Sequence, residues 1–520
     1  MKVAFLFLPP WDPQFPSYAM ALFKGATNEA GHEFIGCDLN VDLYRSAPRK
    51  VRKLWNAQVA NLWSEECDKI VQELSCFVDP YIERITANEI DLYAMSINVY
   101  SKHLAFYIAQ KIKKIRPIAC IFIGGPQCFP AYDGLNILAN KYVDAICTGE
   151  GDLVWPKVLE HFDKNGNLHL DMPGLSYRND EGDIIDNGVP EIVRNLNQIS
   201  NADYSDVDFR KYGNKYQFSI MTSRGCINTC AFCSEKSNFH QYRFRTADNI
   251  YNEVVKHLCE LQNNPSFPSN KRVIPYICFN DSLINGVPRE LEKFCDLVID
   301  GGLKFRWSGM ALIRKELTHE FLAKMKRAGC FHLSWGLESG CQDVLDLMHK
   351  SFFDMILAKK VIKLVHEVGI SQSVSLIAGF PGETEEMFIK TKEFITEYKD
   401  YFAVSIQPMM IAKNSPVYIK PEQFGIKDRN DWLQWQTIDG TNTYDIRLQR
   451  VEMLRSVLGE KLVTIDKGRV SGSGSISLFA HIKFMFAECS RFCLVSCDLF
   501  LSRFPDLHLY ARSVWAKFSK

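Results

Sequence analysis

Short apolar runs alternate with amphipathic stretches through the first 160 residues. Short apolar runs suit strands buried on both faces, and stretches with a period of about 3.6 residues suit helices that pack on a sheet. The pattern predicts an α/β domain over residues 1–160, built on an open parallel sheet. The expected strands are Lys2–Leu8, Glu33–Leu39, Asp91–Asn98, Ile118–Gly124 and Val143–Thr148.

Residues 161–215 are rich in Asn, Asp and Gly, which predicts a connector with a hairpin around Asp180–Gly182. After it the alternation returns, at the spacing of βα units. Six units over residues 216–411 predict a partial, TIM-like (β/α)6 barrel, whose active face lies at the carboxyl ends of its strands. The expected strands are Gln217–Thr222, Ile274–Asp281, Lys304–Met310, Cys330–Leu337, Gln372–Gly379 and Ala403–Met409.

Residues 412–520 predict a mainly helical C-terminal region that covers the substrate. Its aromatic and polar side chains could line a pocket or pack at helical spacing, and both interpretations stay open. SGSGS at 471–475 predicts a flexible break, and the amphipathic helix after it is too short and too charged to span a bilayer. The pocket candidates are Trp432, Trp435, Asn442, Tyr444 and Arg447, and the helix carries Leu478, Ile482, Met485, Cys489, Cys493, Cys497 and Phe500.

Composition narrows the class of protein. Lys and Arg together number 61, as do Asp and Glu, so no overall field favours nucleic acid, and we expect none as a partner. The 17 cysteines are scattered through apolar stretches, where a free cysteine packs as a small hydrophobe. This pattern predicts a reducing compartment, the cytoplasm. The first apolar run is too short for a signal peptide.

Three cysteines share one short segment, MTSRGCINTCAFCSEK, at positions Cys226, Cys230 and Cys233. Three thiolates on one loop can each hold one iron of a 4Fe–4S cluster and leave the fourth iron without a protein ligand. An open metal position is where a substrate or cofactor binds in catalytic metal sites. The alternatives are three incidental thiols or a zinc site, for which His240 is the nearest additional ligand.

The Cys-x3-Cys-x2-Cys spacing, with Phe232 just before the last cysteine, resembles the signature of radical S-adenosylmethionine (radical SAM) enzymes. The resemblance implies that S-adenosylmethionine chelates the open iron and that Phe232 packs near its adenine. It further implies that one electron from the cluster cleaves the sulfonium to a 5′-deoxyadenosyl radical. The electron would come from an external reductant of the flavodoxin or ferredoxin type.

Three further segments, FNDSLIN, WGLESG and AGFPGET, each follow a predicted strand and resemble family segments near the cofactor. The resemblance implies that Asp281, Glu338 and Gly379 contact S-adenosylmethionine, with Glu338 at its ribose or methionine end. Glu338 could also be an ordinary helix-entry residue, because the macrodipole favours a carboxylate there. Thr384 can cap the helix after AGFPGET.

The N-terminal half resembles the flavodoxin-like (Rossmann-like) cobalamin-binding domain that precedes the radical core in one branch of the family. The segments GGP and VDAICTGEGD carry this resemblance, although Gly-rich turns also occur in sheets that bind nothing. The Asp-x-His-x-x-Gly loop that supplies an axial histidine in some cobalamin proteins is absent, so we expect no histidine ligand from that loop. The implied cobalamin contacts are Gly124, Gly125, Pro126, Gly149, Glu150 and Gly151.

Together these resemblances imply a cobalamin-dependent radical SAM methyltransferase that acts on an unactivated carbon of a small metabolite. One S-adenosylmethionine would methylate cobalamin, and another would supply the radical that prepares the substrate to take the methyl group from methylcobalamin. Three alternatives stay open: a non-methylating cyclase or rearrangement enzyme of the same branch, a methylthiotransferase, and an enzyme whose N-terminal domain is only a scaffold. A methylthiotransferase would need a second cluster, for which the N-terminal half offers Cys37, Cys76, Cys120, Cys128 and Cys147.

Overall fold

The computed structural model describes residues 1–56, 62–268, 273–428 and 431–458. The described residues all belong to one compact unit of the chain. The expected break at 471–475 and the amphipathic helix after it lie outside the described residues. A search of the described helices for a span long and apolar enough to cross a membrane finds no candidate.

The first sheet has, within the described residues, the strand order β2-β1-β3-β4-β5-β6-β7. β1 to β5 pair in parallel and confirm the five strands expected from the sequence, whereas β6 and β7 are antiparallel. The strands are β1 (Lys2–Phe7), β2 (Glu33–Asp38), β3 (Leu92–Ser96), β4 (Cys120–Gly124), β5 (Ala145–Cys147), β6 (Leu175–Arg178) and β7 (Ile184–Asp186).

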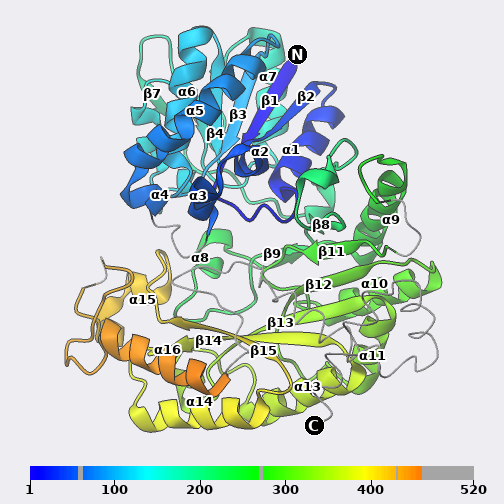
Figure 1. The fold of residues 1–520 in the computed structure, drawn as a ribbon, viewed down its shortest axis with the longest axis vertical. Coiled ribbons are helices and arrows are strands. Elements are labelled where there is room, and N and C mark those ends of the chain that lie inside the picture. Colours follow the sequence, from blue (N-terminus) through cyan, green and yellow to red (C-terminus); the bar gives the residue numbers. More distant parts are fainter. Residues whose placement is uncertain (57–61, 269–272, 429–430, 459–520) are drawn as a thin grey trace, which may run out of the picture. The chain divides into compact units, whose positions relative to one another are not determined.

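The hairpin expected around Asp180–Gly182 is present, but it extends the first sheet instead of lying in a separate connector (Figure 1). Ile146 of β5 lies opposite Ser176 of β6. The hairpin thus covers the edge of β5, whose backbone N–H and C=O groups would otherwise be unpaired. The local pattern predicts a hairpin, but it does not say which distant strand the hairpin joins.

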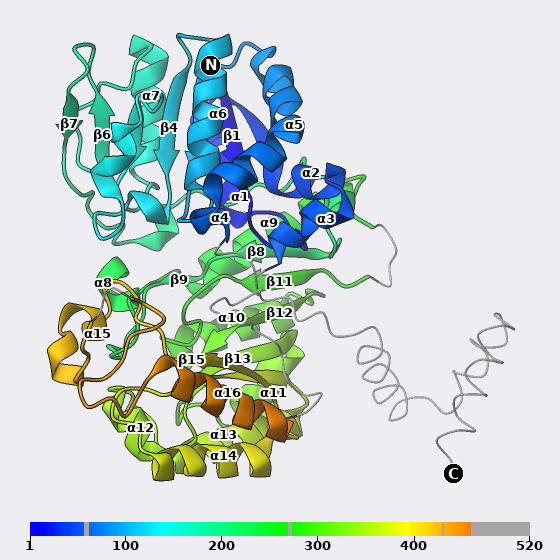
Figure 2. The same ribbon diagram turned by 60° about the vertical axis from the view of Figure 1, so that its left-hand side comes forward.

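Helices cover both faces of the first sheet (Figure 2). Successive residues of a strand point to opposite faces. Ala4 and Leu6 of β1 pack with α5 and α6, and Val3 and Phe5 pack with α1 and α7. Because the strands are buried on both faces, they need apolar side chains at successive positions, which explains the continuous apolar runs of the sequence. The helices of this half are α1 (Tyr18–Glu29), α2 (Leu39–Ser46), α3 (Arg49–Arg52), α4 (Leu62–Glu65), α5 (Cys67–Thr86), α6 (Lys102–Ile115) and α7 (Val154–Asn165).

The second sheet has, in the described part of the chain, the order β15-β14-β13-β12-β11-β8, with every pair parallel. It confirms the six strands expected after the connector. Sequential parallel strands joined by helices make a curved, partial (β/α)6 barrel. The strands are β8 (Gln217–Ile220), β11 (Tyr276–Phe279), β12 (Arg306–Ala311), β13 (Cys330–Glu338), β14 (Ser371–Ala378) and β15 (Ala403–Pro408).

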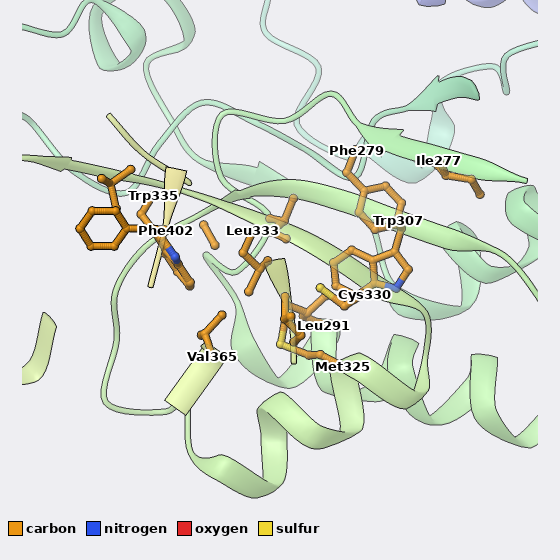
Figure 3. Packing of buried hydrophobic residues seen from close by; sticks show 14 of the residues in the cluster. Ile277, Phe279, Leu291, Trp307, Met325, Cys330, Leu333, Trp335, Val365 and Phe402 are labelled. Carbon is orange, nitrogen blue, oxygen red and sulfur yellow. The ribbon is translucent and has the colours of Figure 1, made fainter. Parts of the chain in front are cut away.

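One face of the second sheet packs on helices and forms the largest apolar core. Figure 3 shows Trp307 of β12 with Leu333 and Trp335 of β13 between the strands and the helices below them. The helices of this half are α8 (Glu235–Phe239), α9 (Ala247–Asn263), α10 (Pro288–Asp300), α11 (His319–Arg327), α12 (Gln342–Leu347), α13 (Met355–Val368), α14 (Glu385–Tyr398), α15 (Pro416–Ile419) and α16 (Tyr444–Leu458).

Candidate active site

The cysteine loop leaves the carboxyl end of β8 and is closed at its base by a short ribbon. β9 (Ser223–Arg224) pairs antiparallel with β10 (Arg243–Phe244), and the three cysteines lie between these strands in sequence. Gly225 opens the loop with φ +76°, and a Cβ there would lie 2.6 Å from the carbonyl oxygen of Gln241. The tight entry to the loop therefore requires glycine.

The cysteine thiols are partly or fully withdrawn from water. Burial raises the pKa of the Cys230 thiol to about 11, against the lowering effect of the Lys350 charge, and it also raises the pKa of Cys233. The nearby thiols contribute in the same direction, because Cys226 and Cys233 both disfavour a second negative charge at Cys230. Metal binding needs thiolates, so iron would supply the positive charge that this loop lacks.

The donor set is compatible with a cluster. Among the described residues, no three His, Cys, Asp or Glu side chains surround one common ion position. A 4Fe–4S cluster needs no such position, because each cysteine binds a different iron. His240, the extra ligand of the zinc alternative, is exposed beyond the end of α8.

Glu338 and Lys350 form a buried ion pair beside the cysteine loop. Glu338 ends β13 with φ +71°, which is uncommon for a residue with a side chain, and its Oε1 lies 3.2 Å from Lys350 Nζ. Lys350 Nζ also lies 5.8 Å from the centre of the Phe232 ring. A carboxylate, a cation and an aromatic ring therefore meet at one point. Strained backbone of this kind gathers at functional sites.

Sequence reasoning missed Lys350. It follows α12 in the segment HKSFF, which carries no motif. The fold brings it to the site because the Ala231 amide of the cysteine loop donates to the Met348 carbonyl at 2.9 Å, which joins the end of α12 to that loop. The only signal in the sequence was a lysine with no obvious acidic partner nearby in the chain, which is a weak indication of a functional site.

Asp281 follows β11 and holds the start of the cysteine loop. Its Oδ1 accepts from the amides of Thr222 and Ser223, both at 2.7 Å, and its Oδ2 accepts from the Thr222 hydroxyl at 2.6 Å. Burial nevertheless raises the pKa of Asp281 to about 7. In the structure the carboxylate positions protein groups, and its predicted contact with S-adenosylmethionine stays a prediction.

Gly379 follows β14 and is held from several sides. Its φ is +80°, and a Cβ there would lie 2.4 Å from Cγ of Arg447. Its amide donates to Glu383 at 2.7 Å, and its carbonyl accepts from Asn442 at 2.9 Å. Arg450 lies 2.9 Å from the same Glu383 oxygen. The loop AGFPGET is therefore a rigid element at the carboxyl end of the sheet.

The pocket candidates after residue 411 act mainly in packing. The Arg447 guanidinium stacks on the Trp435 ring at 3.8 Å and donates to the Trp435 carbonyl at 2.9 Å. Trp435 donates to the Met409 carbonyl at 3.1 Å. Tyr444 begins α16, and Trp432 is exposed. The packing interpretation of this group is the one that the contacts of Trp435 and Arg447 support.

The face of the second sheet opposite its apolar core carries small polar side chains. His332 sits among them, with its ring nitrogens 3.1 Å from Ser371 Oγ and 3.0 Å from Ser373 Oγ. Burial lowers the pKa of His332 to about 4, so the imidazole is neutral at pH 7. The face therefore offers hydrogen bonds and little charge. Its small side chains include Ser219, Cys278, Ser308, Ser334, Ser371, Ser373, Ser375 and Ser405.

The residues expected to contact cobalamin lie at the carboxyl edge of the first sheet, as predicted from their order. Gly124 ends β4, Gly125 and Pro126 follow, and residues 149–151 follow β5, the parallel neighbour of β4. Two of the glycines are also needed for chain packing. A Cβ at Gly125 would lie 2.6 Å from the Ile97 carbonyl oxygen, and one at Gly149 would lie 2.8 Å from Pro190.

Exposed apolar side chains stand at the same edge. Trp11, Val99 and Leu153 follow β1, β3 and β5 and are 44%, 40% and 43% exposed. Apolar side chains at the carboxyl ends of parallel strands can contact the faces of a large planar ligand, because ligands of such sheets bind there. The edge thus offers both glycine-rich backbone and apolar surface.

Comparison with protein families places residues 288–395 in the Radical SAM superfamily, a match that begins after the cysteine loop. An uncharacterised methyltransferase of Pyrococcus horikoshii is 24% identical over 346 residues, 66% of this chain and 69% of the relative. The anaerobic magnesium-protoporphyrin IX monomethyl ester cyclase of Rubrivivax gelatinosus is 24% identical over 64% of this chain and 58% of its own length. Residues 288–395 thus match a radical SAM domain, and the aligned part of the chain spans little more than half the length of that cyclase.

Solved structures extend the likeness to both sheets. The radical SAM methyltransferase TsrM of Kitasatospora setae, with cobalamin and a 4Fe–4S cluster bound, matches with a TM-score of 0.63 and 12% identity, over 91% of this chain and 92% of TsrM. The cobalamin-dependent radical SAM enzyme OxsB matches with a TM-score of 0.60 and 15% identity, over 94% of this chain and 61% of OxsB. The chain therefore has the fold of TsrM and OxsB.

Proposed function

We propose that this protein is a cobalamin-dependent radical SAM methyltransferase that acts on an unactivated carbon of a small molecule. The observation that carries the proposal is the cysteine loop at the carboxyl end of β8, inside a chain whose two sheets together match TsrM. The loop has three cysteines on one segment and a buried Glu338–Lys350 pair beside it. A radical core and an N-terminal cofactor sheet are both needed for this class of chemistry.

Each cofactor has candidate residues. Cys226, Cys230 and Cys233 would hold the 4Fe–4S cluster, and Phe232 with Glu338 would contact S-adenosylmethionine on its open iron. Bound together, the cluster, S-adenosylmethionine and cobalamin would supply a carbon radical and a methyl group. The protein's own part is to orient these groups and to exclude water. An external one-electron reductant is part of the proposal.

The cobalamin would lie at the carboxyl edge of the first sheet. Residues 124–126 and 149–151 bring backbone to that edge, and Trp11, Val99 and Leu153 provide apolar surface. The substrate would lie against the small polar side chains of the second sheet, near neutral His332. The fourteen described cysteines are all free, which supports the proposal that the enzyme functions in the reducing cytoplasm.

Anaerobic reconstitution tests the proposal. The wild-type chain is loaded with iron, sulfide and hydroxocobalamin, and iron and cobalt are counted beside a variant with Cys226, Cys230 and Cys233 changed to Ala. About four irons and about one cobalt per chain are expected in the wild type, and the variant should lose its iron. Four irons without cobalt would reduce the N-terminal half to a scaffold, and eight would favour a methylthiotransferase.

A non-methylating cyclase is the second candidate, because the similarity to the Rubrivivax gelatinosus cyclase spans 64% of this chain. Methyl-labelled S-adenosylmethionine separates the two. Transfer of label into a product supports the methyltransferase, whereas 5′-deoxyadenosine formed with an unlabelled product supports the cyclase. The ribosomal protein uS12 methylthiotransferase of Clostridium novyi is 25% identical over 41% of this chain, and the iron count addresses that reaction.

A further inference from the structure

Four charged side chains form a buried network between the loop after β5 and the base of the cysteine loop. Glu150 and Asp152 come from the first, and Arg224 and Arg243 from the second. Their side chains are 8%, 10%, 11% and 5% exposed. Charges this deeply buried require partners, so the network constrains both loops.

The contacts are bidentate. Arg224 Nη1 and Nη2 lie 2.6 Å and 2.8 Å from the two Asp152 oxygens, and Nη1 also lies 3.3 Å from Glu150 Oε2. Arg243 donates to both Glu150 oxygens, at 2.8 Å from Nη1 to Oε2 and through Nη2 to Oε1. Such fork-to-carboxylate pairs fix orientation as well as distance.

The base of the cysteine loop depends on these carboxylates. Arg224 and Arg243 are direct cross-strand partners in the β9–β10 ribbon. Like charges placed opposite each other in a ribbon repel, so the ribbon closes favourably only when Glu150 and Asp152 neutralise it. Arg224 stands two residues before Cys226, and Arg243 closes the loop after Cys233. The segment that carries the cysteines is therefore held by a loop of the other sheet.

Glu150 was expected to contact cobalamin, but its carboxylate is occupied by protein. Besides the arginines, Oε2 accepts from the Val193 amide at 3.1 Å, and Arg243 Nη1 donates to the Val193 carbonyl at 2.7 Å. Its neighbours Gly149 and Gly151 remain on the same short loop at the carboxyl edge of the first sheet. One loop can thus present backbone to a ligand and carboxylates to the cysteine loop.

We propose that Glu150 and Asp152 are positioning residues of the cluster site. They hold the ribbon that closes the cysteine loop and set the local charge around it. Ligand binding at residues 149–151 is thereby coupled to the cluster environment. This inference rests on the proposed function in assuming that the cysteine loop binds a cluster and that residues 149–151 bind a ligand.

The first test compares the reduction potential and the electron paramagnetic resonance signal of the reduced cluster in reconstituted protein. Glu150→Gln removes a negative charge near the cysteine loop. The reduced cluster is more negative than the oxidised cluster, so the loss of this charge stabilises the reduced form and should raise the reduction potential. Arg243→Gln should lower it, and the double variant should return towards the wild-type value. Glu160→Gln on α7, which breaks an exposed ion pair with Lys164, is the matched control and should leave the reduction potential and the spectrum unchanged.

A purely structural role would not shift the reduction potentials of the two single variants in opposite directions. Equal potentials in all variants, or shifts of the same sign, would overturn the proposal.

The second test needs no cofactor. Amide hydrogen exchange is measured on the full chain without iron or cobalamin, for wild type and for Glu150→Gln, Asp152→Asn and Glu160→Gln. Faster exchange confined to residues 225–242 in the first two variants, with the control unchanged, supports the positioning role. Unchanged exchange there contradicts it. If wild type assembles no cluster, the proposed function fails, and this experiment still decides the role of Glu150 and Asp152.

Discussion

Lys350 and Glu338 form a buried ion pair near the cysteine loop, and each charge compensates the other. Both are buried, and the Nζ–Oε1 distance is 3.2 Å. Lys350→Met should leave a buried carboxylate without its cation and lower the free energy of unfolding by about 3 kcal/mol. Urea unfolding measures this. The double variant Lys350→Met/Glu338→Gln removes both charges and should recover most of the loss. A single variant as stable as wild type would contradict the buried pair.

The buried carboxyl of Asp281 should make the stability of the folded chain depend on pH. Burial raises its pKa from 3.8 to about 7 in the folded chain, so the folded state binds a proton more tightly than the unfolded state. The stabilising contribution is therefore present below about pH 4 and is lost as pH rises through about 7.

Asp281→Asn is the matched test, because its amide can still accept from the Thr222 and Ser223 amides and can donate to the Thr222 hydroxyl. The stability of wild type relative to this variant should fall by up to about 4 kcal/mol between pH 4 and pH 8, measured by urea unfolding across that range. A difference that does not change with pH would show that the carboxyl titrates normally.

At the scale of elements, the loop after β14 is rigid because Gly379 lets Arg447 pass against the backbone. Gly379→Ala combines a strained φ of +80° with a Cβ placed 2.4 Å from Arg447 Cγ. Gly369 at the end of α13 has φ +78°, and a Cβ there would meet no heavy atom within 4 Å, so Gly369→Ala isolates the cost of the backbone.

The control substitution should cost about 1 kcal/mol of folding stability, and Gly379→Ala roughly 3 kcal/mol. Thermal or urea unfolding measures both. Because Gly379 is also a predicted S-adenosylmethionine contact, its variant should bind the cofactor more weakly in equilibrium dialysis, whereas the control should not. Equal losses of stability in the two variants would mean that Arg447 moves aside freely.

At the scale of the whole molecule, the two predicted cofactor sites draw on different sheets. The cysteines follow β8, and the predicted cobalamin residues follow β4 and β5. The variant with Cys226, Cys230 and Cys233 changed to Ala should therefore keep about one cobalamin per chain while losing its iron, as measured by absorbance and metal analysis. Cobalamin lost together with iron would mean that the two sites form only as a unit.

The sequence predicted the strands of both sheets because continuous apolar runs are a local property that double burial requires. It also predicted the cysteine loop, since ligand spacing on one segment is readable without a fold. The match of residues 288–395 to the Radical SAM superfamily and the likeness in fold to TsrM agree with these predictions.

The hairpin of β6 and β7 shows what the local sequence pattern cannot predict. Its turn is visible in the sequence, but its pairing with β5 depends on which strand edge is free in the assembled sheet. The aromatic residues near α16 show the same limit. Trp435 and Arg447 were compatible with a pocket or with packing, and only their contacts separate the two.

By itself the sequence determined the strands of the two sheets, their order and the spacing of the three cysteines, because each of these is encoded within a few neighbouring residues. The tertiary structure decided which charges meet: Lys350 with Glu338, and Glu150 and Asp152 with the arginines at the base of the cysteine loop. In every pair the acidic and the basic residue lie on different segments of the chain, and burial makes their pairing obligatory only after the sheets have formed.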